Sequence, residues 1–138
     1  MNGQTVERYL VTRVPMAGRQ ESVGEAIDRL IGKHFEDASH VFVLAEDGRL
    51  VGVVAIRDLL GATETTAVQD IARAAEGYSV SIDADREDAA SVAIRSGLSI
   101  LAICDADGRL LGAVPARALM TILRGEHLED LHHMVGIL

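Results

Sequence analysis

The chain has 138 residues, of which 49% are hydrophobic, 25% charged and only 3% aromatic, and its formal net charge is −8. These values are typical of a single globular body with an aliphatic core, and they disfavour nucleic acid as a partner while favouring cations. No apolar run approaches the roughly 18 residues of a membrane span, and the amino terminus lacks the apolar core of a signal peptide, so we expect a cytoplasmic location and no direct membrane insertion by this chain.

The first third of the chain predicts a short strand followed by a helix. The run Tyr9–Val14 is rich in β-branched residues and stops at a proline, which is typical of a strand. Ser22, followed three positions later by Glu25, is a capping-box pattern. Apolar residues at helical spacing follow it, so we expect a helix over about residues 23–33.

A stretch of the chain occurs twice, at residues 41–60 and again at residues 101–120. Each copy has an apolar run, an Asp-Gly pair where a hairpin requires positive φ, a second apolar run and a helical pattern, so each predicts a β-hairpin followed by a helix. Cys104 lies in the second copy and is expected in the core, because a lone cysteine cannot form an internal disulfide. The identical pairs, sixty positions apart, are Asp47/Asp107, Gly48/Gly108, Arg49/Arg109, Leu50/Leu110, Gly52/Gly112, Val54/Val114, Arg57/Arg117 and Leu59/Leu119.

The rest of the chain predicts further elements. A short helix is expected between the copies, residues 78–82 alternate as a strand does, and a second helix begins at Asp85, where negative charge complements the helix dipole. Another helix is expected over about residues 116–123. The tail EHLEDLHHMVGIL predicts an amphipathic helix that must dock on another surface. Its apolar stripe consists of Leu128, Leu131 and Met134.

These elements define the predicted fold. Internal repeats dictate architecture, and two copies are too few for a solenoid, so they should pack on each other. We predict an α/β (α+β) protein of two βαββα repeats related by a pseudo-two-fold axis, with a three-stranded sheet in each, helices packed between the repeats and an amphipathic C-terminal helix. The predicted boundaries are 1–66 for the first repeat, 67–124 for the second and 125–138 for the C-terminal connecting helix.

This order of elements, with Gly-hydrophobic-hydrophobic entering the second helix of each repeat, resembles the tandem cystathionine-β-synthase (CBS) domain pair, or Bateman module. Several stretches, among them HVFVLAEDGRLVGVVAIRDLL and the terminal LEDLHHMVG, are closest in pattern to the cytoplasmic CBS region of MgtE-family magnesium transporters. The resemblance implies a regulatory, ligand-sensing module that forms a homodimer. It also implies a membrane transport domain as a partner if the chain is part of a larger one.

CBS pairs bind adenosine nucleotides such as ATP or AMP in clefts between the repeats, and the implied motif is Gly-hydrophobic-hydrophobic-Thr/Ser-x-x-Asp. The first repeat keeps the aspartate as Asp58, whereas the second has Pro115 and Ala118 at the two polar positions. A carboxylate can accept both ribose hydroxyls, and Arg57 supplies a fork for phosphate, so we expect at most one conventional site. The alternative is that Asp58 only caps a helix and Arg57 is a solvated charge. The predicted nucleotide-binding residues are Arg57, Asp58, Tyr78, Ser79 and Val80.

Metal is the second ligand that the resemblance implies, because acidic residues of the MgtE family gather magnesium in the cytosol. Mg²⁺ takes oxygen ligands and keeps several waters, so carboxylates from different elements suit it. Ala118 and Thr121 stand where the family pattern often has aspartate. The alternative explanation of the acidic residues is helix-terminus electrostatics on a solvated face. The matching positions are Asp85, Glu87, Glu129 and Asp130.

Two classes of function follow. The first is the Mg²⁺-sensing and nucleotide-sensing region of an MgtE-type divalent cation transporter. The second is a stand-alone CBS protein that acts as a dimerisation or interaction module with degenerate clefts, which the lost polar groups at Pro115 and Ala118 favour. We do not expect an enzyme, because no nucleophile–base pattern, P-loop or dinucleotide fingerprint occurs.

Overall fold

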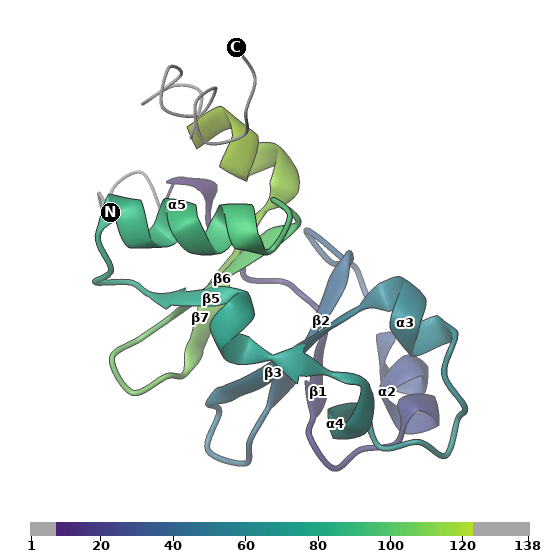
Figure 1. Ribbon diagram of the computed structural model, residues 1–138. Coiled ribbons are helices and arrows are strands. Elements are labelled where there is room, and N and C mark those ends of the chain that lie inside the picture. The colour runs from purple at the N-terminus through teal and green to yellow at the C-terminus, as the bar shows by residue number, and fades with distance from the viewer. Residues whose placement is uncertain (1–7, 123–138) are drawn as a thin grey trace.

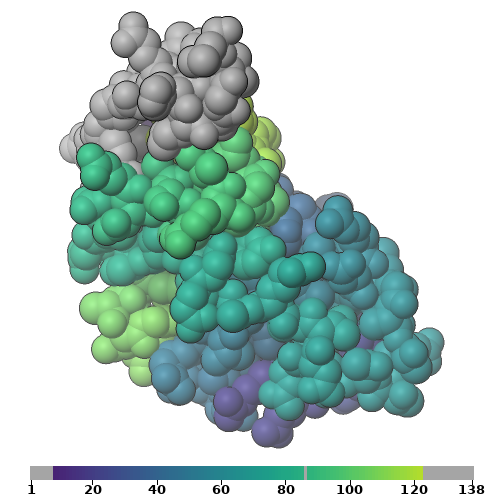
Figure 2. All heavy atoms as spheres, viewed as in Figure 1, coloured from purple at the N-terminus to yellow at the C-terminus, as the bar shows by residue number. Residues whose placement is uncertain are grey.

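The computed structural model describes residues 8–122, which form two small sheets flanked by helices (Figure 1). The first sheet has the strand order β1-β2-β3-β4 and the second β5-β6-β7. The pairs β1-β2 and β5-β6 are parallel, whereas the pairs β2-β3 and β6-β7 are antiparallel. Figure 2 shows the repeats as two lobes. The predicted α+β fold of two βαββα repeats is confirmed.

The strands are β1 (Met16–Gly18), β2 (His40–Leu44), β3 (Leu50–Ala55), β4 (Arg73–Ala74), β5 (Ser79–Ser81), β6 (Ile100–Cys104) and β7 (Leu110–Pro115). The helices are α2 (Val23–Leu30), α3 (Ile56–Leu60), α4 (Val68–Ile71), the 3₁₀ helix η1 (Ala75–Gly77) and α5 (Arg86–Arg95). Residues 116–122 are also helical. The first sheet therefore has one strand more than predicted, β4.

Both Asp-Gly turns place glycine in the left-handed region, as predicted: φ is 91° at Gly48 and 84° at Gly108. The two turns also contact each other. Leu50 N donates to Gly108 O at 2.9 Å, and Leu110 N donates to Gly48 O at 3.4 Å. A pseudo-two-fold axis between the repeats produces this reciprocal exchange.

The predicted beginnings of the two longer helices are confirmed. Ser22 Oγ accepts from Glu25 N at 3.1 Å and Glu25 Oε1 accepts from Ser22 N at 3.0 Å, which completes the capping box of α2. Asp85 caps α5 by accepting a backbone N–H three residues later at 2.8 Å. Helix α2 ends before the predicted position because the chain turns at Gly32, where φ is 85°, a conformation that favours glycine.

The shared core lies between the two sheets, whereas the sequence predicted helices there. Helices α2 and α3 cover the outer face of the first sheet, and α5 and the 116–122 helix cover that of the second. The prediction was wrong because β2 and β6 are apolar on both faces, so alternation along them did not indicate which face meets the other repeat. Cys104 is buried, as expected. The shared core contains Val11, Val14, Phe42, Leu50, Val53, Ala75, Ile100, Ala102, Cys104 and Ala113.

The predicted strand Tyr9–Val14 is wrong, because the first strand, β1, begins only at Met16. Val11 and Val14 are buried, but they do not belong to a strand of the first sheet. Val11 N donates to Ala113 O at 2.8 Å and Ala113 N donates to Val11 O at 2.9 Å. The β-branched run therefore packs along β7 of the second repeat.

The two repeats exchange edge segments. β4, which lies beyond the predicted boundary at residue 66, pairs with β3 of the first sheet, whereas Val11 pairs with β7 of the second. Each crossing passes over a glycine: a Cβ on Gly52 would lie 2.9 Å from Ala72 Cβ, and a Cβ on Gly112 would lie 2.6 Å from Val11 O. Packing therefore requires the glycine of each Gly-hydrophobic-hydrophobic motif.

Within residues 8–122, no helix is both long enough and apolar enough to span a bilayer. The predicted C-terminal connecting helix and its apolar stripe lie outside the described residues.

Candidate functional site

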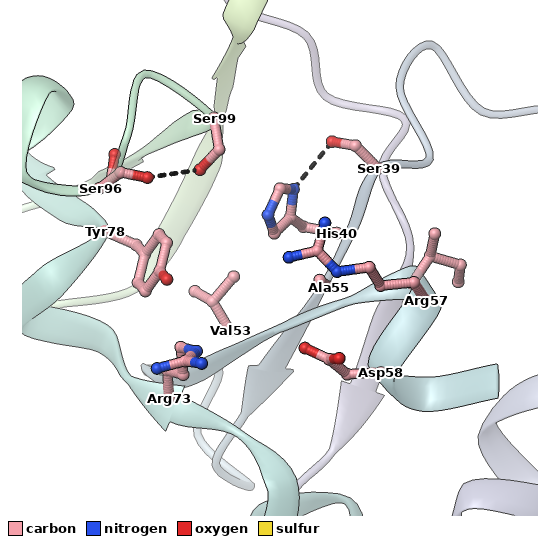
Figure 3. A pocket seen from close by; sticks show the side chains of 11 residues that line it. Ser39, His40, Val53, Ala55, Arg57, Asp58, Arg73, Tyr78, Ser96 and Ser99 are labelled. Atoms are coloured by element: carbon pink, nitrogen blue, oxygen red, sulfur yellow. Dashed lines mark hydrogen bonds between the residues drawn. The ribbon is translucent and has the colours of Figure 1, made fainter. Parts of the chain in front are cut away.

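A cavity of about 320 Å³ lies between the two repeats, where β3 enters α3. Its volume is within the range of small-molecule sites, roughly 300–1,000 Å³. Most of its wall comes from residues before position 67, and Arg73, Tyr78, Ser96 and Ser99 come from the part of the chain that follows (Figure 3). The lining residues are Ser39, His40, Val53, Ala55, Ile56, Arg57, Asp58, Arg73, Tyr78, Ser96 and Ser99.

Three charged side chains of this cavity form the charged triad: Arg57 and Asp58 from the first turn of α3, and Arg73 from β4 (Figure 3). None of the three makes a hydrogen bond or ion pair with another described residue. Guanidinium groups match phosphate oxygens bidentately, and a carboxylate accepts from hydroxyls. The arrangement can therefore hold an anionic ligand that also carries hydroxyl groups.

Asp58 does not make the capping hydrogen bond that the alternative interpretation assigns to it. The N-cap of α3 is Ala55, and no side chain caps this helix. Asp58 lies inside the first turn, where a negative charge is favourable. Its carboxylate oxygens remain available to a ligand.

A chain of hydrogen bonds reaches His40 at the cavity. Asp37 Oδ1 accepts from Ser39 N at 3.0 Å and from Ser39 Oγ at 2.6 Å, and Ser39 Oγ lies 2.8 Å from His40 Nδ1. The His40 and Tyr78 ring centroids are 6.3 Å apart, with the planes tilted by 46°. Burial lowers the pKa of His40 below its usual 6.5, although the Asp37 charge acts in the opposite direction.

Of the residues predicted to bind nucleotide, the structure brings Arg57, Asp58 and Tyr78 to one cavity. Ser79 and Val80 do not line it. Ser79 Oγ donates to a backbone carbonyl of η1 at 2.7 Å, and Val80 packs against the core of the second repeat.

The sequence did not identify Ser39, His40, Arg73 and Ser99 as cavity residues. Arg73 was missed because β4 was not predicted. Ser39 and Ser99 stand sixty positions apart, just before β2 and β6, so extending the repeat by two residues would have identified this pair.

The corresponding position of the second repeat is different. Pro115 and Ala118 are buried, and Ala118 belongs to the core of that repeat. Arg117, the counterpart of Arg57, lies 3.7 Å from Asp37 in an ion pair. The second repeat thus offers neither a carboxylate nor an unpaired arginine at this position.

Two of the four predicted metal ligands lie in the described part of the chain. Asp85 caps α5, and Glu87 is exposed in the first turn of the same helix. Glu129 and Asp130 lie outside the described residues. Within residues 8–122, no three His, Cys, Asp or Glu side chains lie close enough together to hold a metal ion.

Comparison with known proteins identifies relatives of the whole described fold. A family model described as "CBS domain" matches residues 6–65. The magnesium transporter MgtE of Thermus thermophilus is 31% identical over 131 residues, which cover 93% of this chain and 29% of the transporter. The chain therefore spans less than a third of that relative.

Two solved structures are similar. The cytosolic domain of the Mg²⁺ channel MgtE in complex with ATP has a TM-score of 0.71 and 27% identity, over 87% of this chain and 52% of that one. The soluble part of a magnesium transporter has a TM-score of 0.75 over 86% of this chain and 47% of that one, at 24% identity, a likeness of fold alone.

Proposed function

We propose that this chain is a tandem pair of CBS domains and forms the Mg²⁺-sensing and adenine-nucleotide-sensing region of an MgtE-type divalent cation transporter. The match of residues 6–65 to the CBS domain and the similarity to MgtE support this proposal. The place of the chain is then the cytosolic face of a membrane, as a homodimer joined to a membrane transport domain and without catalytic activity. We propose the same division of the chain, into 1–66, 67–124 and 125–138.

The observation that carries the nucleotide proposal is the charged triad. Two arginines without ion-pair partners in the described chain converge on one cavity of a protein whose net charge is −8, and unneutralised guanidinium groups attract phosphate. Asp58 would accept from the ribose hydroxyls, with Tyr78 near the base. The MgtE relative that contains ATP supports this assignment. A module used only for dimerisation would not need the charged triad.

Replacing both arginines of the charged triad, Arg57→Met with Arg73→Met, is expected to weaken ATP binding by about tenfold or more per arginine, because hydrogen bonds to charged groups are among the strongest. The affinity for adenosine, which lacks phosphate, should fall little. Calorimetric titration with ATP, AMP and adenosine measures the difference.

The matched control for the arginine variant is Arg95→Met, because Arg95 is exposed on α5 and does not line the cavity. It should bind ATP as the wild type does. Equal losses for ATP and adenosine in the double variant would contradict the assignment of phosphate to these arginines.

The metal proposal is tied to assembly. Leu60 and Met120, sixty positions apart, are 64% and 37% exposed on helices of the two repeats, and a second copy of the chain would cover them. A dimer brings two chains of charge −8 together, which costs Coulomb energy that divalent cations relieve. The proposed metal ligands are Asp85, Glu87, Glu129 and Asp130.

We expect millimolar Mg²⁺ to make the homodimer more compact, as measured by small-angle scattering and limited proteolysis at matched ionic strength. The control is the charge-neutral variant Asp85→Asn, Glu87→Gln, Glu129→Gln and Asp130→Asn, in which asparagine retains the cap of α5. This variant should respond to Mg²⁺ no more than to the matched salt. A monomer under both conditions, or a dimer with identical profiles, would leave the metal proposal without support.

A further inference from the structure

The tautomer of His40 follows from its hydrogen bonds. The Asp37 carboxylate only accepts, so its 2.6 Å contact with Ser39 Oγ uses the hydroxyl hydrogen. The Ser39 oxygen can then only accept from His40 Nδ1, 2.8 Å away. In the neutral ring this fixes the proton on Nδ1 and leaves a lone pair on Nε2, which has no partner in the described part of the chain.

The ring is neutral at pH 7 because burial holds its pKa below 6.5. Asp37 and Asp58 favour the protonated ring, and Arg57 disfavours it. Arg73 and Tyr78 are the other titratable groups that line the cavity with it. The lone pair on Nε2 is therefore present at pH 7 and is lost when the pH falls through the lowered pKa.

The unpaired nitrogen lies on the edge of the ring opposite the Ser39 contact, on the side of Tyr78 (Figure 3). Tyr78 and Val53 give this part of the cavity aromatic and apolar surface, which favours a flat base over a phosphate. The charged triad provides the polar surface that phosphate and ribose require. A bound nucleotide would therefore place its base within reach of His40.

We infer that His40 Nε2 accepts a hydrogen bond from the exocyclic amino group of adenine, so that His40 is the residue by which the cleft selects this base. This inference rests on the proposed nucleotide function. Adenine presents an amino donor at its 6-position, whereas guanine presents an oxygen acceptor, which would face the Nε2 lone pair without a hydrogen. A polar site of this kind rejects a ligand that lacks the matching group.

The test compares ATP with purine riboside triphosphate, which is the same molecule without the 6-amino group. At pH 7.5 the wild type should bind ATP about tenfold more tightly. His40→Phe, which keeps a ring of similar size but has no acceptor, should reduce this ratio to about one. Ser39→Ala should lower this ratio partly, because the tautomer is no longer fixed. The control Ser91→Ala, at an exposed position of α5 that does not line the cavity, should leave the ratio unchanged.

Acidification supplies a second readout. As the pH is lowered through the pKa of His40, the ratio should fall in the wild type, because a protonated Nε2 is a donor that faces the amino donor of adenine. In His40→Phe the ratio should not change with pH. An unchanged ratio in His40→Phe that still binds ATP would overturn the role of His40 and leave the nucleotide site standing. If the wild type bound neither nucleotide, the proposed nucleotide site and this inference would both fall.

Discussion

Asp58→Ala is expected to weaken the binding of ATP and AMP by about a hundredfold or more, so that calorimetry no longer detects it. The carboxylate is proposed to accept both ribose hydroxyls, and hydrogen bonds to a charged group are worth several-fold to a hundredfold each. Because the Asp58 side chain makes no hydrogen bond or ion pair within the described chain, the Tm of the unliganded variant should change by no more than about 2 °C.

The matched control is Asp70→Ala. Asp70 occupies the first turn of α4 as Asp58 occupies that of α3, and it is exposed and does not line the cavity. Asp70→Ala should bind ATP normally. Undiminished ATP binding by Asp58→Ala would remove the nucleotide proposal for this cleft.

Gly112→Ala is expected to lower the free energy of unfolding by about 2–3 kcal/mol, the upper part of the range for overpacked sites. The added Cβ would lie 2.6 Å from the carbonyl oxygen of Val11 and 2.9 Å from Leu10 Cγ. The backbone cannot move away cheaply, because Val11 and Ala113 exchange two hydrogen bonds of 2.8 and 2.9 Å there. Thermal denaturation should record a fall in Tm of roughly 6–10 °C.

Gly77→Ala is the control for this packing prediction. Gly77 has an ordinary φ, and a Cβ placed there meets nothing within 4 Å. The Tm of the Gly77→Ala variant should stay within about 2 °C of that of the wild type. Equal stability of the Gly112→Ala and Gly77→Ala variants would mean that the crossing of Val11 over β7 does not hold the repeats together.

Features encoded within a few residues could be predicted from the sequence. The Ser22 and Glu25 pair fixes the start of α2, and the Asp-Gly pairs fix the turns at Gly48 and Gly108, because each depends on neighbouring backbone groups only. The repeat of sixty positions predicted the matching order of elements in the two halves. Arg57 and Asp58 could be placed at the start of a helix for the same reason, since they belong to a contiguous motif.

Features that depend on contacts between distant segments could not be predicted in this way. Tyr9–Val14 has the composition of a strand, yet Val11 pairs with a residue about a hundred positions later. Arg73 belongs to the cavity only because β4 joins the sheet of the first repeat. Likewise, the sequence of β2 does not indicate which of its two apolar faces packs against the other repeat. These contacts are set by the packing of one repeat on the other.

The most direct test of the central claim, one adenine nucleotide per chain in the cleft of the first repeat, is a crystal structure determined with ATP. We expect nucleotide density in the cavity, with phosphate against the two arginines of the charged triad, ribose at Asp58 and the adenine amino group near His40 Nε2. No nucleotide is expected at Ala118. An empty cavity at saturating ATP, or nucleotide bound at Ala118 instead, would contradict the claim.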